Sequence, residues 1–325
     1  MSILITGGAG YIGSHTAKRL SGVGREIVVL DNLSTGRRRN ACWGRLVEGE
    51  IGDGVLVRKV LRDHHVTAVV HLAASTDVAE SAMRPDFYFE NNIIATKRLL
   101  DAMHDEGVRQ LVFASSCSVY GNTISETVNE EHAASPLSPY GESKLAVERM
   151  LPWYERAWGL RWMALRYFNA AGAEDALGED ISVSHRIIPR AMHAALTTGA
   201  SLRMYGSSFA TNDGSAVRDY VHVSDIAQAN LCALRWVEAL HTGGIINIGA
   251  GHGTSVHDIV RAVEAETGRR VPCEVHPARE GDPEHVVADL SAARKVLGWT
   301  PHCSDIQTIV RSLLRSFETR RAGPE

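Results

Sequence analysis

The sequence predicts an α/β fold with a doubly wound parallel sheet, and two features carry this prediction. A short apolar run at residues 3–5 is followed at once by glycines and then by an amphipathic helical pattern, which is typical of a buried parallel strand that turns into a helix. Strand-like and helix-like segments then alternate as far as residue 167. Repeated β–α units predict a parallel sheet with helices on both faces, the Rossmann-type architecture.

The glycine turn predicts a dinucleotide site. Gly7, Gly10 and Gly13 stand at G-x-x-G-x-x-G spacing, and a helical pattern begins at Tyr11 and Ile12. Glycine permits a tight turn and lets a pyrophosphate approach the backbone. The start of the helix then offers free N–H groups and a positive dipole end to the phosphates.

The next strand, residues 26–30, ends in Asp31. An acid at this distance from the glycines is where a ribose 2′-hydroxyl is held. Because a carboxylate repels a 2′-phosphate, we expect NAD rather than NADP. The three arginines at 37–39 would favour NADP, but we interpret them as a solvated loop because Asp31 occupies the discriminating position. The alternative is a structural turn with a solvated aspartate.

The remaining elements of the first half follow in order. The patterns predict strands at residues 45–48, 67–71, 110–114 and 161–167, helices at 54–64, 86–106 and 140–158, and a polar loop at about 122–137. Ser138 followed by Pro139 is a good helix start, since serine caps the helix and proline fits its first position.

Beyond Asn169 the pattern loosens into shorter segments. We expect helices near 184–198, 223–240, 255–267, 290–298 and 304–320, and strands near 202–205, 217–222, 245–248 and 272–275. We therefore divide the chain into a dinucleotide-binding domain at 1–168, to which segments at about 217–250 return, and a smaller interwoven C-terminal lobe at 169–325 for the substrate.

The glycine-rich segment 249–255 has two interpretations. It resembles a second phosphate loop after a strand. Alternatively, its glycines form a turn in which Thr254 or Ser255 caps the next helix. We favour the turn.

Composition narrows the class of protein. A net charge of −4 gives no general attraction to nucleic acid or anionic membranes. No apolar run approaches the roughly 20 residues needed to span a bilayer. Only Met1 and Ser2 precede the first strand, so we expect no targeting segment. The five cysteines lack C-x-x-C spacing, which favours reduced thiols in a cytoplasm, and the histidines show no metal-binding pattern, so we expect no metal.

Tyr140 and Lys144 are the candidate catalytic pair, because four residues apart they share one helix face. A phenol with a pKa of about 10 is a poor base at neutral pH. A nearby ammonium lowers that pKa, and an oxidised nicotinamide lowers it further. The pair can then exchange a proton with a hydroxyl while hydride moves to or from the ring. Ser116 could hydrogen-bond the same hydroxyl; the alternative is that Ser115 and Ser116 merely finish their strand.

These residues carry a resemblance that runs almost end to end. The chain resembles the UDP-glucose (UDP-galactose) 4-epimerases of the extended short-chain dehydrogenase/reductase family. The matching stretches are residues 7–13 (GGAGYIG), 31–33 (DNL), 71–74 (HLAA), 90–92 (ENN), 115–121 (SSCSVYG), 140–144 (YGESK), 165–172 (LRYFNAAG), 217–223 (VRDYVHV) and 279–282 (REGD).

The resemblance implies reversible C4 epimerisation of a UDP-hexose with tightly held NAD. Tyr140 would take the 4-hydroxyl proton while C4 gives hydride to NAD. The 4-keto sugar would rotate about its link to the diphosphate, and hydride would return to its other face. Lys144 would hold the ribose and lower the Tyr140 pKa, and Ser116 would guide the hydroxyl proton.

The resemblance also assigns binding residues. For the cofactor these are Gly7, Gly10, Tyr11, Ile12, Gly13, Asp31, Asn32, Glu50, Ile51, Leu72, Ala73, Ala74, Asn91, Tyr140, Lys144 and Tyr167. For the UDP-sugar they are Ser116, Tyr140, Asn169, Tyr205, Arg218, Arg279, Asp282 and Val286. Among these, Asn169, Arg218 and Arg279 would hold the diphosphate, Asp282 the uridine ribose, and Tyr205 would line the uracil. Arginine suits this role through its fixed charge and fork of donors.

Three positions depart from the family pattern. Glu50 replaces the usual aspartate at the adenine, and its longer side chain still offers an acceptor. Thr76 stands where a lysine is common, so one cofactor contact is lost. Val286 stands at the position that gates the sugar 2-substituent, where some members carry tyrosine. A smaller side chain leaves room for an N-acetyl group, so we expect UDP-N-acetylglucosamine and UDP-N-acetylgalactosamine as further substrates.

Other functions of the same fold stay open to different degrees. A dehydratase is disfavoured, because Cys117 and Ser118 stand where dehydratases carry an Asp-Glu acid/base pair. The residues around the sugar C6 cannot be identified from the sequence. A UDP-uronate epimerase or decarboxylase therefore stays possible, as does another nucleotide-sugar dehydrogenase or reductase. A non-enzymatic NAD(P) sensor could dispense with Tyr140, Lys144 and Ser116. By resemblance we also expect a homodimer formed through the helices at about 86–106 and 140–157.

Overall fold

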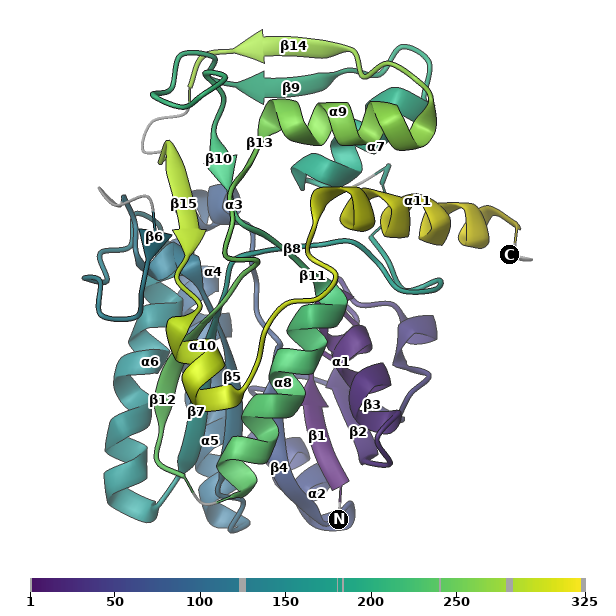
Figure 1. The fold of residues 1–325 in the computed structure, drawn as a ribbon. Coiled ribbons are helices and arrows are strands. Elements are labelled where there is room, and N and C mark those ends of the chain that lie inside the picture. Colours follow the sequence, from purple (N-terminus) through teal and green to yellow (C-terminus); the bar gives the residue numbers. More distant parts are fainter. Residues whose placement is uncertain are drawn as a thin grey trace.

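The computed structural model describes residues 2–122, 127–179, 181–182, 184–239, 241–278 and 283–322. A seven-stranded parallel sheet forms the centre of the larger part of the molecule (Figure 1). Its strands run in the order β12-β7-β5-β4-β1-β2-β3, and every neighbouring pair is parallel. This confirms the predicted doubly wound sheet. The strand order reverses between β1 and β4, which is where such sheets bind ligands, at the carboxyl ends of the strands.

The strands of the large sheet are short and mostly buried. They are β1 (Ser2–Thr6), β2 (Glu26–Asp31), β3 (Arg45–Glu48), β4 (Val66–His71), β5 (Gln110–Ser116), β7 (Arg161–Tyr167) and β12 (Gly244–Ile248). All five residues of β1 are buried, as expected for a strand that is covered by helices on both faces.

Helices cover both faces of this sheet, and each face has its own apolar core. On one face lie α1 (Tyr11–Ser21), α8 (Val223–Glu238) and α10 (Ser291–Leu297). On the other lie α2 (Gly54–Asp63), α5 (Ala95–Asp105) and α6 (Pro139–Trp158). Short one-turn helices follow β2 and β5 at η1 (Arg38–Ala41) and η3 (Cys117–Val119).

The long helix expected at 86–106 is interrupted. The structure has α4 (Pro85–Phe89), a π-helical turn η2 (Glu90–Ile94) and then α5. The backbone N–H of Ala95 donates to the carbonyl of Glu90, five residues back, which is the π pattern. A further helix, α3 (Val78–Met83), precedes α4 and was not expected.

The second lobe lies beyond one end of the large sheet, at the top of Figure 1. A four-stranded sheet joins β13 (Thr254–Ser255), β10 (Val217–Arg218), β15 (His285–Ala288) and β6 (Thr127–Val128). Two ribbons pair β11 (Tyr220–His222) with β8 (Asn169–Ala171), and β14 (Cys273–His276) with β9 (Leu202–Tyr205). Helices α7 (Ile187–Leu196), α9 (Val256–Thr267) and α11 (Ile306–Ala322) enclose a third apolar core.

The second lobe differs in detail from the expected pattern. The strand expected at 217–222 is divided at Asp219 into β10 and β11, which belong to different sheets. Strand β6 lies within the expected polar loop at 122–137 and pairs with β15, which is distant in the sequence. Every helix in the described ranges is too short or too polar to span a bilayer. Within the same ranges, no group of three or more His, Cys, Asp or Glu side chains is placed to hold a metal ion.

Candidate active site

The glycine turn packs tightly at the carboxyl end of β1. Gly7 has a φ of +68°, and a Cβ there would lie 2.7 Å from the backbone nitrogen of Ala73. A Cβ on Gly13 would lie 2.1 Å from the carbonyl oxygen of Gly7. Only glycine fits at these two positions, so the turn brings backbone against backbone and starts α1 directly at the end of the strand.

The start of α1 can hold an anion. Its N-cap residue is Gly10, which has no side chain that could occupy the free N–H groups of the first turn. The N–H groups of a first helical turn have no intrahelical acceptor, and the positive end of the helix dipole lies beside them. Together with the reversal of strand order between β1 and β4, this cradle fits the diphosphate of a dinucleotide.

Asp31 ends β2 beside this cradle and is only 6% exposed. Its carboxylate accepts hydrogen bonds from the backbone N–H groups of Ala9, at 2.9 Å, and Leu33, at 2.8 Å. Leu33 adopts a positive φ of 60° in this tight loop. The carboxylate is therefore fixed against the glycine turn, where the sequence expects it to meet a ribose.

The neighbouring loops support the same side of the site. The amide of Asn32 donates to both carboxylate oxygens of Glu50, at 3.0 and 3.1 Å, so these two predicted cofactor residues are in contact. Ile51 is buried beside them in the core. Arg38 forms an exposed ion pair with Glu48, which agrees with interpreting this arginine as part of a surface loop.

The segment after β4 lies against the glycine turn. Thr6 binds it twice, because its carbonyl accepts from the N–H of Leu72 at 3.1 Å and its hydroxyl from that of Ala73 at 3.3 Å. The half-buried residues 72–74 thus line the switch point. Thr76, at the position of the missing lysine, is exposed.

The π-helical turn places Asn91 and Asn92 near the first turn of α6. The Asn91 amide donates to the Ser75 hydroxyl at 3.0 Å. The buried Asn92 amide donates to the Ser143 hydroxyl at 3.0 Å, and Ser143 in turn donates to the carbonyl of Tyr140 at 2.7 Å. This chain of hydrogen bonds joins the segment after β4 to the first turn of α6.

Three further predicted cofactor residues use their side chains within the protein. Tyr11 donates from its hydroxyl to the carbonyl of Gly172 at 2.6 Å, and Ile12 packs against the main core. Tyr167, at the end of β7, donates to Asn230 at 2.7 Å. Any contact of Tyr11 or Tyr167 with a dinucleotide is therefore made through other atoms than a free hydroxyl.

Tyr140, Lys144 and Ser116 come together where β5 meets α6. Helix α6 starts at Pro139, and the Ser138 hydroxyl caps it by accepting from the N–H of Gly141 at 3.1 Å. Tyr140 is 8% and Lys144 4% exposed. The Lys144 ammonium lies 5.9 Å from the centroid of the Tyr140 ring. The Ser116 hydroxyl donates to the hydroxyl of Ser118 at 3.1 Å and interacts with the phenol of Tyr140.

Burial shifts the pKa values of both Tyr140 and Lys144. Burial raises the pKa of Tyr140, and the hydrogen bond with Ser116 opposes that rise. Burial lowers the pKa of Lys144 to about 7, while the Glu148 carboxylate opposes the fall. The lowered phenol pKa expected from the sequence is thus not what the chain alone produces, because desolvation disfavours the phenolate and outweighs the opposing hydrogen bond.

The second lobe carries four of the predicted substrate residues on its strands: Asn169, Tyr205, Arg218 and Val286. Asn169 in β8 donates from its side chain to the carbonyl of Asp219 at 2.9 Å. Arg218 in β10 is the register partner of Val286 in β15, and Val286 is 6% exposed. Tyr205 ends β9, where its ring lies 5.6 Å from that of His276. Arg279 and Asp282 lie outside the described residues.

The loop at 249–255 is a structural turn. The Asp219 carboxylate accepts from the backbone N–H groups of Ala250, at 2.5 Å, and Gly251, at 3.0 Å. Those amides are therefore occupied by a side chain of the protein. Ser255 caps α9 in a reciprocal capping box with Asp258. Both observations confirm that this segment is a structural turn rather than a second phosphate loop.

Sequence reasoning missed Glu148 and Arg186. Glu148 continues the i, i+4 series of Tyr140 and Lys144, a signal that could have been found. Arg186 lies at the N-cap of α7, with its guanidinium 4.8 Å from the centroid of the Tyr11 ring. Its charge opposes the rise in the pKa of Tyr140, and no local pattern connects it with that residue.

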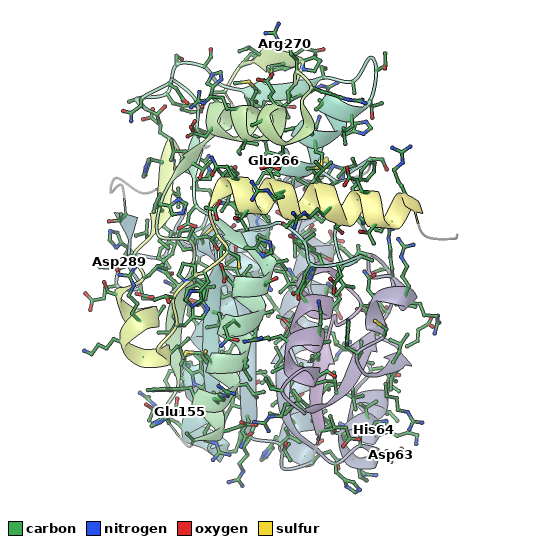
Figure 2. The ribbon with its side chains drawn as sticks, turned by 45° about the vertical axis from the view of Figure 1, so that its right-hand side comes forward. Asp63, His64, Glu155, Glu266, Arg270 and Asp289 are labelled. Carbon is green, nitrogen blue, oxygen red and sulfur yellow. The ribbon has the colours of Figure 1, made fainter. Side chains whose placement is uncertain are left out.

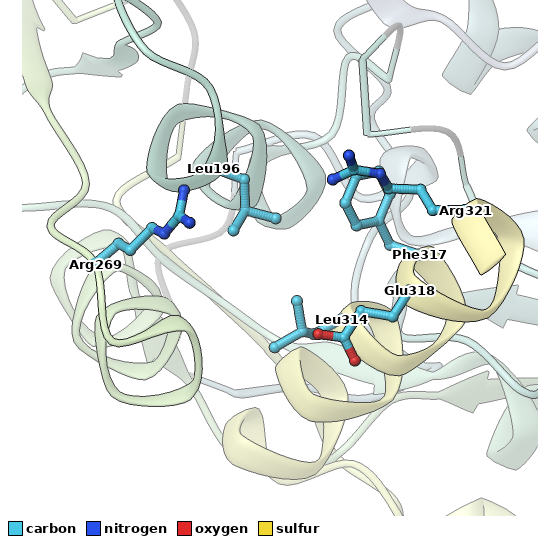
Figure 3. Close-up of a pocket in the computed structure, with 6 residues that line it drawn as sticks. All are labelled: Leu196, Arg269, Leu314, Phe317, Glu318 and Arg321. Atoms are coloured by element: carbon cyan, nitrogen blue, oxygen red, sulfur yellow. The ribbon is translucent and has the colours of Figure 1, made fainter.

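A pocket of about 420 Å³ lies elsewhere, on the surface of the second lobe (Figure 3). It is lined by Leu196, Arg269, Leu314, Phe317, Glu318 and Arg321. None of these residues belongs to the predicted site.

Comparisons with known proteins agree with this arrangement. A model of the NAD dependent epimerase/dehydratase family matches residues 3–249. The UDP-glucose 4-epimerase of Lacticaseibacillus casei is 40% identical over 326 residues, which covers 99% of this chain and 98% of that protein.

Solved structures show the same fold. The UDP-glucose 4-epimerase of Brucella ovis in complex with NAD superposes with a TM-score of 0.93 at 42% identity and covers 96% of both chains. The UDP-glucose-4-epimerase of Stenotrophomonas maltophila, with bound NAD and formylated UDP-arabinopyranose, gives a TM-score of 0.94 at 34% identity and covers 99% of this chain and all of that one (100%).

Proposed function

The chain belongs to the NAD dependent epimerase/dehydratase family, and we propose that it is an NAD-dependent isomerase that catalyses the reversible C4 epimerisation of a UDP-hexose. The observation that carries the proposal is the meeting of Tyr140, Ser116 and Lys144 beside the dinucleotide cradle of β1 and α1. Bound NAD supplies the hydride acceptor and donor. The chain has to supply proton transfer, orientation and a shielded site.

Tyr140 is the acid and base at the sugar C4 oxygen. Its phenol takes the hydroxyl proton as C4 is oxidised, and returns it as the 4-keto sugar is reduced on the opposite face. Burial keeps the free phenol protonated. The positive charge of Lys144 favours the phenolate of Tyr140, and an oxidised nicotinamide would add a second positive charge of the same effect, so we expect proton transfer to depend on cofactor loading.

Ser116 orients the reacting hydroxyl of the sugar, because its own hydroxyl is held by Ser118 and faces the phenol of Tyr140. The next residue, Cys117, argues against dehydration. Burial raises the pKa of the Cys117 thiol to about 12, so this side chain stays protonated at neutral pH and cannot act as the base that elimination of water requires.

The UDP moiety binds between the two lobes in this proposal. Arg218 and Asn169, with Arg279 and Asp282, hold the diphosphate and the ribose, and Tyr205 lines the uracil. Asn169 and Arg218 lie close together, which supports this placement: Arg218 directly precedes Asp219 in the chain, and the Asn169 side chain donates to the carbonyl of Asp219. Val286 is the register partner of Arg218, and its small side chain supports turnover of N-acetylated UDP-hexoses as well.

A homodimer and a cytoplasmic setting are part of the proposal. Exposed apolar side chains gather on the helices from α3 to α6: Met83 is 76% and Trp153 67% exposed, and Phe87, Phe89 and Ile94 are also exposed. Burial of such side chains between two copies of the chain would remove them from water. All five cysteines are free thiols, which suits a reducing compartment.

Proton NMR of the purified protein tests the function. Separate incubations contain UDP-galactose, UDP-N-acetylgalactosamine or UDP-galacturonate, each with NAD. We expect the anomeric signal of the gluco epimer from the first two sugars. Reaction of UDP-galacturonate alone would establish a uronate enzyme instead, and dinucleotide binding without any turnover would indicate a sensor.

A further inference from the structure

Strand β5 and helix α6 meet through three consecutive strand residues. The carbonyl of Ala114 accepts from the Lys144 ammonium at 2.8 Å. The Ser115 hydroxyl donates to a carboxylate oxygen of Glu148 at 2.5 Å. The side chain of Ser116 interacts with the third helix residue, Tyr140. The three helix residues lie four apart on one face, so the stripe that carries the catalytic pair ends in a carboxylate.

Glu148 is held in a buried ion pair. Arg166, the register partner of Ser115 in the neighbouring strand β7, donates to both oxygens of this carboxylate, at 2.9 and 2.7 Å. The side chains of Glu148 and Arg166 are 2% and 4% exposed. Replacing a buried ion pair with apolar side chains is often neutral or stabilising, so stability alone does not account for this pair.

The charges around Lys144 leave Glu148 as its buried anion among the described residues. From β4 it faces His71, whose pKa is lowered to about 3 by burial and which is therefore neutral. From β5 it faces the Phe113 ring, 5.0 Å from the ammonium. From α6 it faces Tyr140 and Glu148, and the guanidinium of Arg166 in β7 is paired with the Glu148 carboxylate.

We propose that Glu148 is a positioning residue of the active site, which acts through Lys144 by placing a buried negative charge one helical turn beyond the ammonium group. Ser115 and Arg166 fix that carboxylate, and the carbonyl of Ala114 fixes the ammonium. The negative charge of Glu148 therefore opposes the fall in the pKa of Lys144 that burial causes, and so increases the share of Lys144 that carries its proton at neutral pH. This inference rests on the proposed function only for its effect on turnover.

Two variants distinguish the effect of the Glu148 charge on Lys144 from an effect on folding. Glu148→Gln keeps the shape of the side chain but leaves Arg166 buried without its carboxylate. The double variant Glu148→Met with Arg166→Met removes both charges and keeps apolar volume. We expect the pKa of Lys144 to fall in both, and to fall further in Glu148→Gln because the remaining arginine repels the ammonium.

Lysine NMR measures this directly, because the chain has only five lysines. The ¹³Cε signal of Lys144 is assigned with Lys144→Met and titrated in the NAD-loaded protein. We expect its midpoint to fall by about one pH unit or more in Glu148→Gln. The matched control is Glu266→Gln, which removes the bidentate partner of Arg311 in the second lobe (Figure 2), and should leave the midpoint unchanged.

The pH profile of kcat provides a second measurement. Activity falls as pH rises and Lys144 loses its proton, and this limb should move to lower pH in both Glu148 variants while the KM for the UDP-sugar stays within a few-fold. A midpoint for Lys144 that equals the wild-type value in both variants overturns the inference, even if the variants are less stable. Absence of epimerisation by the wild-type chain overturns the proposed function, while the titration still decides the role of Glu148.

Discussion

Lys144 is anchored to the sheet, because its ammonium donates a 2.8 Å hydrogen bond to the main-chain carbonyl of Ala114. The flexible Lys144 side chain is thereby held by a rigid strand. Ala114 lies two residues before Ser116 in that strand, and Lys144 lies one helical turn after Tyr140. The precision of the site comes from the junction of β5 and α6 rather than from a loop, which is the arrangement that preorganised catalysis requires.

Tyr140→Phe should abolish epimerisation and leave dinucleotide binding intact. The phenol is the proton carrier in the proposed function, and loss of a general acid/base residue costs about 10²–10⁴ in rate. The ring stays, so its packing with Tyr88, at 6.5 Å between centroids, is kept. Turnover is followed by NMR and NAD binding by calorimetry. Undiminished turnover would remove Tyr140 from this role.

Lys144→Met should inactivate the protein yet stabilise it at neutral and acid pH. The folded pKa of Lys144, about 7, lies below its unfolded value. The buried charge therefore lowers the free energy of unfolding in full below pH 7, and this cost fades as pH rises toward the unfolded pKa of about 10.4. Thermal melts at pH 6 and pH 9.5 measure it. The gain in Tm should be larger at pH 6; an equal gain at both pH values would contradict the assigned pKa.

Asp31→Asn should narrow the preference for NAD over NADP. The substitution keeps the shape of the side chain but removes the charge that repels a 2′-phosphate. It also replaces one of the two oxygens that accept from Ala9 and Leu33 with an NH2 group, which cannot accept. Hydrogen bonds to charged groups contribute about 1.5–3 kcal/mol, so NAD affinity should fall about 10- to 100-fold, and NADP affinity should change less. Calorimetric titration with both dinucleotides provides the ratio, and an unchanged ratio would show that another group discriminates.

Gly13→Ala should destabilise the fold and weaken NAD binding. The added methyl group would lie 2.1 Å from the carbonyl oxygen of Gly7, so the glycine turn would have to open. A backbone clash in a packed turn costs about 1–3 kcal/mol. The matched control is Gly54→Ala in α2, where a Cβ meets only the end of the Arg58 side chain at 3.5 Å. Equal melting temperatures for the two variants would contradict the packing argument.

The parts of this protein that depend on local chemistry were predictable from sequence. The glycine turn, the position of Asp31 at the end of β2 and the cap of α6 by Ser138 each follow from residues within a few positions of one another. The ordered β–α alternation then determined the class of the sheet.

The parts that depend on distant partners were not predictable. The ion pair of Glu148 and Arg166 joins a helix to the following strand, and a charge in an amphipathic helix is usually interpreted as solvated. Strand β6 has two residues and exists only because β15, far along the chain, pairs with it. The occupation of the loop amides at Ala250 and Gly251 by Asp219 has the same cause, since propensity does not reveal which side chain will fill a turn.

Val286→Tyr should change the ratio of two activities. Val286 is nearly buried and pairs with Arg218, so a tyrosine at this position would project a ring into the space beside the proposed diphosphate contact. If the wild-type side chain leaves room for an N-acetyl group, turnover of UDP-N-acetylgalactosamine should fall about tenfold or more in the variant, while turnover of UDP-galactose should change only a few-fold. Overpacking a buried site costs about 1–3 kcal/mol, so Val286→Leu serves as a control for added bulk without the reach of tyrosine. Both sugars are measured by NMR on the same preparation, because a general loss of folded protein lowers the two rates equally. A ratio that matches the wild-type value would show that residue 286 does not gate the sugar 2-position.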